Sequence, residues 1–477
     1  MALARSEVQR AQCLAPGRHI DASLDGAAGR YGRLFGELDA LSDDETRLLA
    51  FCGPGGVCDG GPGYVTAYRT EAGWPFFGQL IAHDITADRS PLMHGARADQ
   101  LVNSRTPRAD LECLYGAGVV GNPFLYQRED PAKLLVDGNH AGEPGDVPRN
   151  AEGIALIGDP RNDSHLFVSQ LHLAMLRLHN LAVDHLRGKD VPEGSIFDEA
   201  RRILSWIYQW VIVNEYLPRL AGRALVDEVL ADGPRFYRPG PQPRIPLEFA
   251  DAAFRYGHSQ VREDYVLNER SGRLTLFPDL LGFAPVPAER TIDWSRLFDV
   301  PGHDPAQRAK RIDGALTASL IALPQAITGD VEVAAQRALS CRDLQRGHSY
   351  GLPSGESVAR AMGERALSAE EVGLAATGWR YERRSGTTYC ARPTCAPTAR
   401  ASDPWAGASS PKCCSGSSTQ GHTARTTPTG APHCRPVARR SRSTTCSSRC
   451  TPDPFGLKRR PCAPDADPHS RSSASVT

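Results

Sequence analysis

Apolar residues that recur at steps of three and four are the feature of this chain that most constrains its fold. They run through residues 44–51, 74–85, 165–186, 196–217, 313–323 and 356–363. Such steps place apolar side chains on one face of an α-helix, whereas the period-two alternation of a half-buried strand is scarce here. The sequence therefore predicts a mainly α-helical domain, with loops rich in proline and glycine between its helices.

The composition of the chain changes abruptly near residue 380. Of the 55 basic and 55 acidic side chains, 15 basic and 5 acidic ones lie at or after Tyr381, which leaves 40 and 50 before it. Eight of the 13 cysteines also lie there, and leucine, isoleucine and valine nearly vanish. We therefore divide the chain into an N-terminal extension (1–29), a helical domain (30–380) and a low-complexity tail (381–477) with the composition of a disordered segment.

Translation in a shifted reading frame explains this tail better than selection for a function. Codons for cysteine, tryptophan, tyrosine and many serines begin with T, and a shifted frame turns them into middle-T codons, which encode only apolar residues. Re-read in this way, residues 384–395 can encode an apolar segment that resembles a helix. The interpretation places a frameshift between Trp379 and Arg384, so that the last helices of the domain are missing. A genuine cysteine-rich tail is the alternative.

The N-terminal residues contain no apolar stretch of signal-peptide length, and the five cysteines before residue 380 are scattered. These features predict a reduced, cytoplasmic protein, with secretion by another route left open. The most apolar long segment, residues 203–220, contains Gln209, Asn214 and Glu215 and is shorter than the ~20 residues of a membrane span. We interpret it as a buried helix, and we expect neither a membrane span nor a nucleic-acid partner. The sequence leaves the oligomeric state open.

Three polar residues within residues 76–90 form the first candidate site. On a helix, Gln79 and His83 lie four residues apart on one face, whereas Asp84 is turned about 100° away. The face with Gln79 and His83 could bind a ligand, and the face with Asp84 could bind a cation. A lone histidine on such a helix is, however, more often an ordinary packed residue. Taken alone, Arg161 is a capping or surface residue in the turn that starts the long helix from Leu166, and His258 is a core histidine.

Taken together, six ordered motifs resemble the animal haem peroxidases, a family that includes the mammalian granule and thyroid peroxidases, the peroxinectins, the cyclooxygenases and bacterial relatives. Their order and spacing are similar to the bacterial branch across about residues 30–380. The motifs are RYGRLFGEL…GPGG, FFGQLIAHDIT, NSRTPRADLECLYGAG, GDPRNDSH…LHN, FRYGHS and LQRGHSYGLPSG. The resemblance implies a mainly α-helical domain with haem between a distal and a proximal helix. It also implies reduction of hydrogen peroxide coupled to oxidation of a small organic or halide donor.

On the distal side, the resemblance implies three roles. His83 is similar to the histidine that moves a proton from one peroxide oxygen to the other, which requires a neutral imidazole. Arg161 resembles the arginine that stabilises charge on the departing oxygen. Gln79 resembles the glutamine that holds water or halide by hydrogen bonds.

On the proximal side, His258 resembles the ligand of the haem iron. Arg255 and Arg346 are similar to the arginines that pair with the haem propionates. Asp343 stands where an asparagine usually supports the iron-binding histidine. A carboxylate there would push electron density onto the iron.

The resemblance also implies a calcium site beside the distal helix. Asp84, Thr106, Asp110 and the backbone carbonyl of Arg108 match ligands of that site, and hard oxygen donors suit calcium. Glu112 stands where a serine usually provides the remaining ligand, and a carboxylate can bind there too.

Other positions depart from the family pattern. Ala82 and Ser164 align with the acidic residues that form ester bonds to haem in the mammalian enzymes, so haem b is expected to be bound non-covalently. Arg255 stands where cyclooxygenases and fatty-acid dioxygenases carry a radical-forming tyrosine, which favours a peroxidase. Three alternatives stay open: a fatty-acid dioxygenase, a non-catalytic adhesion or interaction protein similar to some peroxinectins, and a broken gene product that never matures.

His165, His172 and His179 recur every seven residues and lie near one helix face. Neighbouring members are about 10 Å apart at 1.5 Å rise per residue, too far to share one metal ion. The sequence assigns these histidines to packing or to solvent.

Overall fold

The computed structural model describes residues 31–41, 45–87, 101–136, 145–238, 243–368 and 370–372. All of these residues belong to one structural unit. The extension 1–29 and the tail 381–477 lie outside the described residues, so the three-part division of the chain and the frameshift stay predictions.

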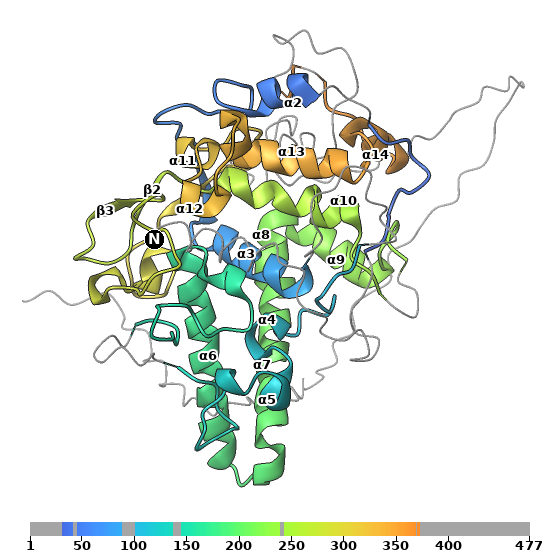
Figure 1. The fold of residues 1–477 in the computed structure, drawn as a ribbon. Coiled ribbons are helices and arrows are strands. Elements are labelled where there is room, and N and C mark those ends of the chain that lie inside the picture. The colour runs from blue at the N-terminus through green and yellow to red at the C-terminus, as the bar shows by residue number, and fades with distance from the viewer. Residues whose placement is uncertain are drawn as a thin grey trace, which may run out of the picture. The chain divides into compact units, whose positions relative to one another are not determined.

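Helices dominate the described residues, which confirms the predicted fold class (Figure 1). The longer α-helices are α2 (Glu45–Cys52), α3 (Trp74–Ile85), α6 (Leu166–Arg187), α7 (Glu193–Val211), α9 (Arg223–Asp232) and α13 (Leu339–Ser349). The shorter ones are α4 (Glu112–Tyr115), α5 (Gly118–Gly121), α8 (Leu217–Ala221), α10 (Leu247–Ala250), α11 (Ala318–Ile321), α12 (Gln325–Thr328) and α14 (Gly355–Ala361). The 3₁₀-helices are η2 (Pro123–Leu125), η3 (Pro160–Asp163), η5 (Ala253–Gln260), η6 (Ala288–Arg290), η7 (Trp294–Arg296) and η8 (Ala334–Arg337), and η4 (Ile212–Tyr216) is a π-helix.

The strands form two small antiparallel pairs. β1 (Ala67–Glu71) pairs with β4 (Arg308–Lys310), with a register irregularity between Ala67 and Glu71. β2 (Asp264–Val266) pairs with β3 (Arg273–Thr275), with Tyr265 opposite Leu274. Both pairs are too short to organise the fold, so helix packing builds the core.

The helix α3 passes through the core, and most of its side chains are buried. Phe76 of α3 stacks on Phe167 of α6, with ring centroids 4.2 Å apart. On another side of α3, a Cβ atom at Gly78 would lie 2.3 Å from the hydroxyl of Tyr216, so only glycine allows this close approach. That hydroxyl is in turn hydrogen-bonded to the hydroxyl of Tyr256 in η5. The helix α3 is therefore packed against both α6 and η5, the segment that carries His258.

A five-residue connection joins α6 to α7, and the two helices pack side by side (Figure 1). The expectation that residues 203–220 are a buried helix is wrong in two respects. Trp206 and Trp210 of α7 are 59% and 57% exposed, because they lie on the outer face of an amphipathic helix. The helical run is also interrupted by η4 before it continues as α8. None of the described helices combines the length and the apolar character that a membrane span requires.

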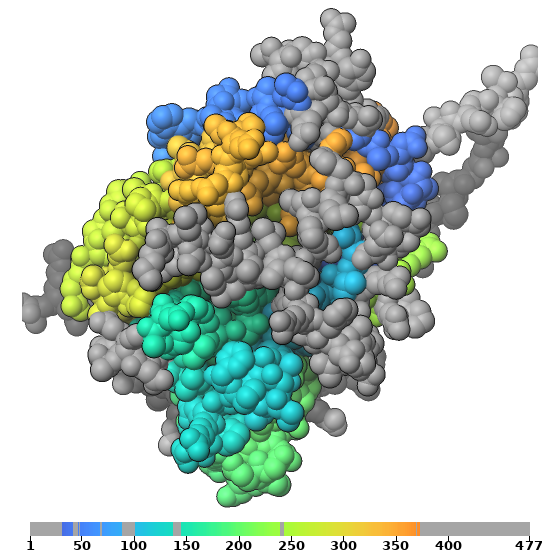
Figure 2. All heavy atoms as spheres, viewed as in Figure 1, coloured from blue at the N-terminus to red at the C-terminus, as the bar shows by residue number. Residues whose placement is uncertain are grey.

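A disulfide bond between Cys52 at the end of α2 and Cys341 of α13 joins residues 289 positions apart. The segment around α2 (blue) lies against the segment around α13 (orange) in the view of Figure 2. The prediction that the cysteines of the body are reduced is therefore wrong for this pair, because the fold brings two distant thiols together. Disulfides persist in oxidising compartments, so the pair weighs against the cytoplasmic location, which stays a prediction.

Candidate active site

The distal part of the candidate site is built from α3 and η3. His83 of α3 faces Asn162 of η3, and its Nδ1 lies 2.7 Å from the amide oxygen of that asparagine. The amide nitrogen of Asn162 lies 2.9 Å from Nδ1 of His172 in α6. Burial and the positive charge of Arg161 lower the pKa of His83 to about 3. The His83 ring is therefore neutral near pH 7, as a group that accepts a proton must be.

Arg161 is held beside His83 by a buried carboxylate. Its Nε and Nη2 donate to Asp159 at 3.0 and 2.7 Å, and Nη2 also donates to the backbone carbonyl of His83 at 2.8 Å. Arg105 donates to the same carboxylate at 2.7 Å. Burial alone would raise the pKa of Asp159, but the two guanidinium groups hold it well below its usual range. Asp159 caps η3, where its side chain accepts from the backbone N–H of Arg161, and the long helix α6 starts separately after His165.

Gln79 lies one turn before His83 on α3, as the helical spacing predicts. Its side-chain oxygen accepts a hydrogen bond from Nε2 of His165 at 2.8 Å. This contact fixes the orientation of the amide and leaves its NH₂ group free to donate elsewhere. His165 is the residue immediately before α6, so the start of α6 orients Gln79, while His172 of α6 contacts the asparagine that faces His83.

The proximal part of the candidate site is built from η5 and α13. Nδ1 of His258 lies 2.6 Å from a carboxylate oxygen of Asp343. The other oxygen of Asp343 accepts from Arg255 at 2.8 Å. Burial alone would raise the pKa of Asp343, but the charges of His258 and Arg255 hold it below its usual range. Asp343 is therefore an ionised partner for the histidine ring.

Two arginines share a second carboxylate on the proximal side. Arg255 donates to Asp251 at 3.0 Å, and Arg346 approaches the same oxygen at 3.3 Å. Arg346 lies one turn after Asp343 on α13, so both project from one face of that helix. The structure thus brings together His258 and the three other residues predicted for the proximal side, Arg255, Asp343 and Arg346.

A small pocket lies beside His258. Its polar lining includes Arg255, Asp343 and Asp251, and its apolar lining includes Phe51, Val57, Leu316, Leu344 and Val372. The Nε atom of Arg255 is buried and, within the described residues, has no hydrogen-bond partner. The pocket therefore combines a mainly apolar lining with Arg255 and its two carboxylate partners.

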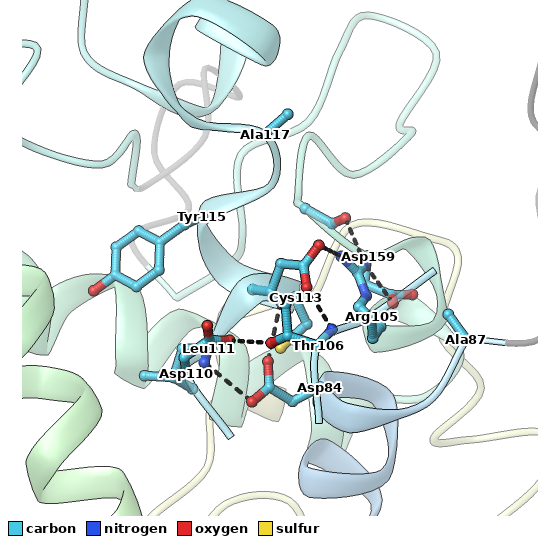
Figure 3. Close-up of polar contacts among 12 residues, drawn as sticks. Asp84, Ala87, Arg105, Thr106, Asp110, Leu111, Cys113, Tyr115, Ala117 and Asp159 are labelled. Carbon is cyan, nitrogen blue, oxygen red and sulfur yellow. Dashed lines mark hydrogen bonds and ion pairs between the residues drawn. The ribbon is translucent and has the colours of Figure 1, made fainter. Parts of the chain in front are cut away.

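The residues predicted for calcium lie together beside α3, but their side chains already bond to the protein (Figure 3). The two oxygens of Asp84 accept from the backbone N–H groups of Leu111 and Cys113 at 3.0 and 3.2 Å. Thr106 donates to Asp110 at 2.9 Å. Burial raises the pKa of Asp84 to about 6, and the like charge of Asp110 adds to the rise.

The remaining predicted calcium ligands point to other partners. Glu112 accepts from the backbone N–H of Thr106 at 2.9 Å, and the carbonyl of Arg108 accepts from Gln209 of α7 at 3.2 Å. Within the described part of the chain, no three histidine, cysteine, aspartate or glutamate side chains are grouped as metal ligands. The calcium site therefore stays a prediction.

Sequence reasoning missed four residues that contact the predicted site. Asn162, His165 and His172 hold the distal residues, and Asp251 holds both proximal arginines. The assignment of His165 and His172 to packing or solvent is incomplete, because both are buried and hydrogen-bonded, His165 to Gln79 of α3 and His172 to Asn162 of η3. Their seven-residue spacing was a usable signal, since it places both on the side of α6 that turns toward the core.

Comparisons with known proteins indicate a family and a fold. The family model described as "Animal haem peroxidase" matches residues 95–371. "Heme peroxidase 2" of Caenorhabditis elegans is 32% identical over 123 residues, which are 24% of this chain and 17% of that protein. Among solved structures, peroxidase A from Dictyostelium discoideum has a TM-score of 0.55 at 15% identity, covering 77% of this chain and 86% of that one. A fatty acid α-dioxygenase from Oryza sativa has a TM-score of 0.51 at 14% identity, covering 76% and 71%.

The family model spans more than half of the chain, whereas the structural likenesses are at low identity and show the fold alone. The aligned region covers between 14% and 33% of the length of the curated relatives compared. The activity of those longer proteins therefore does not transfer to this chain without further argument.

Proposed function

Because the chain belongs to the animal haem peroxidase family, we propose that it binds haem and reduces hydrogen peroxide while it oxidises a small organic or halide donor. The observation that carries the proposal is that two histidines, His83 and His258, are each held through one ring nitrogen, but by different kinds of partner. His83 and His258 each have Nδ1 occupied by a partner, Asn162 or Asp343. Neither ring forms a hydrogen bond through Nε2 within the described residues, so each has one nitrogen available for chemistry.

The residues around His258 fit a haem group. A histidine that binds a metal through one nitrogen usually donates its other N–H to a carboxylate or carbonyl, as His258 does to Asp343. The Nε atom of Arg255, which has no hydrogen-bond partner among the described residues, would donate to a propionate carboxylate. His258 would hold the iron, with Arg255 and Arg346 near the propionates.

When bound, haem supplies a redox centre that passes electrons from the donor to the peroxide. His83 takes a proton from one peroxide oxygen through Nε2 and returns it to the other oxygen, so that two water molecules form once the donor has given two electrons and two further protons have been taken up. Arg161 stabilises the negative charge on the departing oxygen, and its Nη1 forms no hydrogen bond within the described residues. The amide NH₂ of Gln79 would hold a water molecule or a halide ion.

Substitution of the proposed iron ligand tests the function. His258→Ala should abolish the haem spectrum and the peroxidase activity, because no other nitrogen is placed at the end of η5 to bind the iron. His303→Ala, which changes an exposed histidine, is the matched control and should keep both. A His258→Ala protein with a normal haem spectrum and activity would overturn the proposal, and a native protein that never takes up haem would favour a non-catalytic interaction protein.

The haem should also be removable without breaking a covalent bond. Ala82 and Ser164 have no carboxyl group from which an ester to haem could form. Acid-acetone should therefore extract the haem completely, and haem that stays with the chain would show another covalent link.

Calcium is the second cofactor that we propose, with Asp84 and Asp110 as its charged ligands. Burial and the nearby charge of Asp110 oppose the ionisation of Asp84, and a bound cation would relieve that cost. Asp84→Ala should lower the calcium content measured by atomic emission. Asp198→Ala on α7 is the control. An unchanged calcium content in Asp84→Ala would refute this assignment.

The fatty-acid dioxygenase alternative rests on a likeness of fold. The residue three positions before His258 is Arg255, whose guanidinium group contacts two carboxylates. A phenol that could form a radical is absent from that position, so a peroxidase is the function that we propose.

A further inference from the structure

Asn162 connects the candidate distal histidine to a second buried histidine that the proposed mechanism does not use. The asparagine is fully buried in η3, and its two amide atoms face different rings. Its oxygen meets Nδ1 of His83 at 2.7 Å, and its nitrogen meets Nδ1 of His172 at 2.9 Å. The Nε2 atom of His172 is buried and unpartnered within the described residues.

The direction of these hydrogen bonds determines which ring nitrogens carry protons. An amide oxygen can only accept, so Nδ1 of His83 must carry a proton, and the Nε2 atom of a neutral ring is then bare. The amide nitrogen can only donate, so Nδ1 of His172 must be bare and its Nε2 must carry the proton. If the amide turned over, every donor and acceptor would exchange, and Nε2 of His83 would carry a proton.

From this geometry we infer that Asn162 and His172 are positioning residues that hold His83 in the tautomer with a bare Nε2. The inference rests on the proposed function for its purpose, because only that tautomer can take a proton from peroxide. His172 acts through Asn162: its bare Nδ1 keeps the amide nitrogen toward α6 and the amide oxygen toward α3.

Packing alone does not account for a histidine at position 172. A buried N–H group without a partner destabilises the fold, and a leucine of similar size would avoid this cost. His179, one heptad further along α6, is equally buried but bonds to Tyr115 and to the carbonyl of Ala132. It therefore serves as a matched control that shares the helix and the burial and lacks the contact with the distal site.

The first experiment measures the tautomer directly in the protein without haem. Protonated and bare imidazole nitrogens differ in ¹⁵N chemical shift, and His83→Gln identifies the His83 signals in protein labelled at histidine. The native protein should show a protonated Nδ1 and a bare Nε2 at His83. His172→Leu should shift His83 toward the Nε2–H form, which an unconstrained neutral imidazole favours.

Two further variants sharpen the test. His172→Gln should retain the native tautomer, because its side-chain oxygen can still accept from Asn162, and the control His179→Phe should also retain it. If His172→Leu fails to fold, Asn162→Leu tests the inference instead, because it removes the amide oxygen that accepts from His83. A native His83 with its proton on Nε2, or a native-like tautomer in both folded leucine variants, would overturn the inference.

A kinetic experiment separates this inference from the proposed function. In haem-loaded protein, His172→Leu should keep its haem content and react about 10- to 100-fold more slowly with hydrogen peroxide, the size of effect found when a residue that orients a functional histidine is removed. An unchanged rate would refute the positioning role. Failure of the native protein to bind haem would refute the proposed function, whereas the tautomer measurement would still decide the inference.

Discussion

The two sides of the candidate site use the same side chain with different partners. On the distal side, His83 meets the neutral amide of Asn162, in surroundings that lower its pKa to about 3. On the proximal side, His258 meets the ionised carboxylate of Asp343, which also contacts Arg255. The two rings therefore differ in the charge of the group that contacts Nδ1, which is neutral for His83 and negative for His258.

This difference has a direct chemical meaning. A neutral acceptor fixes the tautomer of an imidazole without drawing its proton away, which suits a group that gains and loses a proton at its other nitrogen. A carboxylate pulls on the Nδ1 proton and makes Nε2 a stronger electron donor, which suits a metal ligand. The comparison predicts opposite consequences for changes on the two sides.

The largest effect should come from removing each ring in turn. His258→Ala should lose haem altogether, whereas His83→Ala should keep its haem content and react 10²- to 10⁴-fold more slowly with hydrogen peroxide. Haem content by absorbance and the rate of peroxide reaction by stopped flow provide the two measurements. Loss of haem in both variants, or in neither, would remove the distinction between the two sides.

Acid should act mainly on α3 and on the segment 165–187, where several histidines are held neutral. Burial lowers the pKa of these rings to about 3 or 4, and the residues are His83, His165, His172 and His179. Because unfolding restores an ordinary pKa near 6.5, their contribution to stability is present above that pH and is lost as the pH falls toward 4.

Two buried carboxyl groups oppose this trend. Burial raises the pKa of Asp84 and Asp163 to about 6, so their contribution to the free energy of unfolding grows as the pH falls. The balance is an uptake of about two protons on unfolding between pH 6 and pH 4, or roughly 3 kcal/mol per pH unit. Urea unfolding at a series of pH values should show this slope, and His179→Phe should lower it by about one proton. A flat profile would contradict the burial of neutral histidines.

A substitution that makes the proximal partner neutral sharpens the comparison. Asp343→Asn should weaken haem retention or activity about 10- to 100-fold, because the histidine loses the carboxylate that strengthens it as a ligand. The reduction potential of the bound haem should rise, since less electron density reaches the iron. Asp304→Asn, at an exposed position, is the control. A falling potential would contradict the role assigned to Asp343.

The smallest effect concerns the contact that joins the two sides. Gly78→Ala would place a Cβ atom 2.3 Å from the hydroxyl of Tyr216, which is bonded to Tyr256 of the proximal segment. The overlap should destabilise the protein by about 1–3 kcal/mol. Tyr216→Phe removes the hydroxyl, so the double variant should lose less stability than the sum of the two single changes. If the losses of stability in the two single variants simply add in the double variant, the close approach of Gly78 to Tyr216 does not limit stability.

The helices and the polar residues on them were predictable from local sequence, whereas the partners were not. Periodicity places α3 at residues 74–85 and α6 within one residue of its observed bounds, and the spacing of Gln79 and His83 follows from the helix itself. Asn162 is 79 positions from His83, and Asp251 is 95 positions from Arg346. Such contacts depend on how helices pack, which local patterns do not encode. The π-helix η4 was missed because its residues continue the apolar periodicity of α7.

The disulfide between Cys52 and Cys341 turns most of the domain into a covalent ring. The closed loop contains both candidate histidines, and Asp343 lies two residues beyond its end. A single cut by a protease anywhere inside this loop leaves two fragments that remain one molecule until the bond is reduced. Nicked protein should therefore run as a single band without reductant and as separate bands with it, and the two sides of the site should remain tethered through the cut.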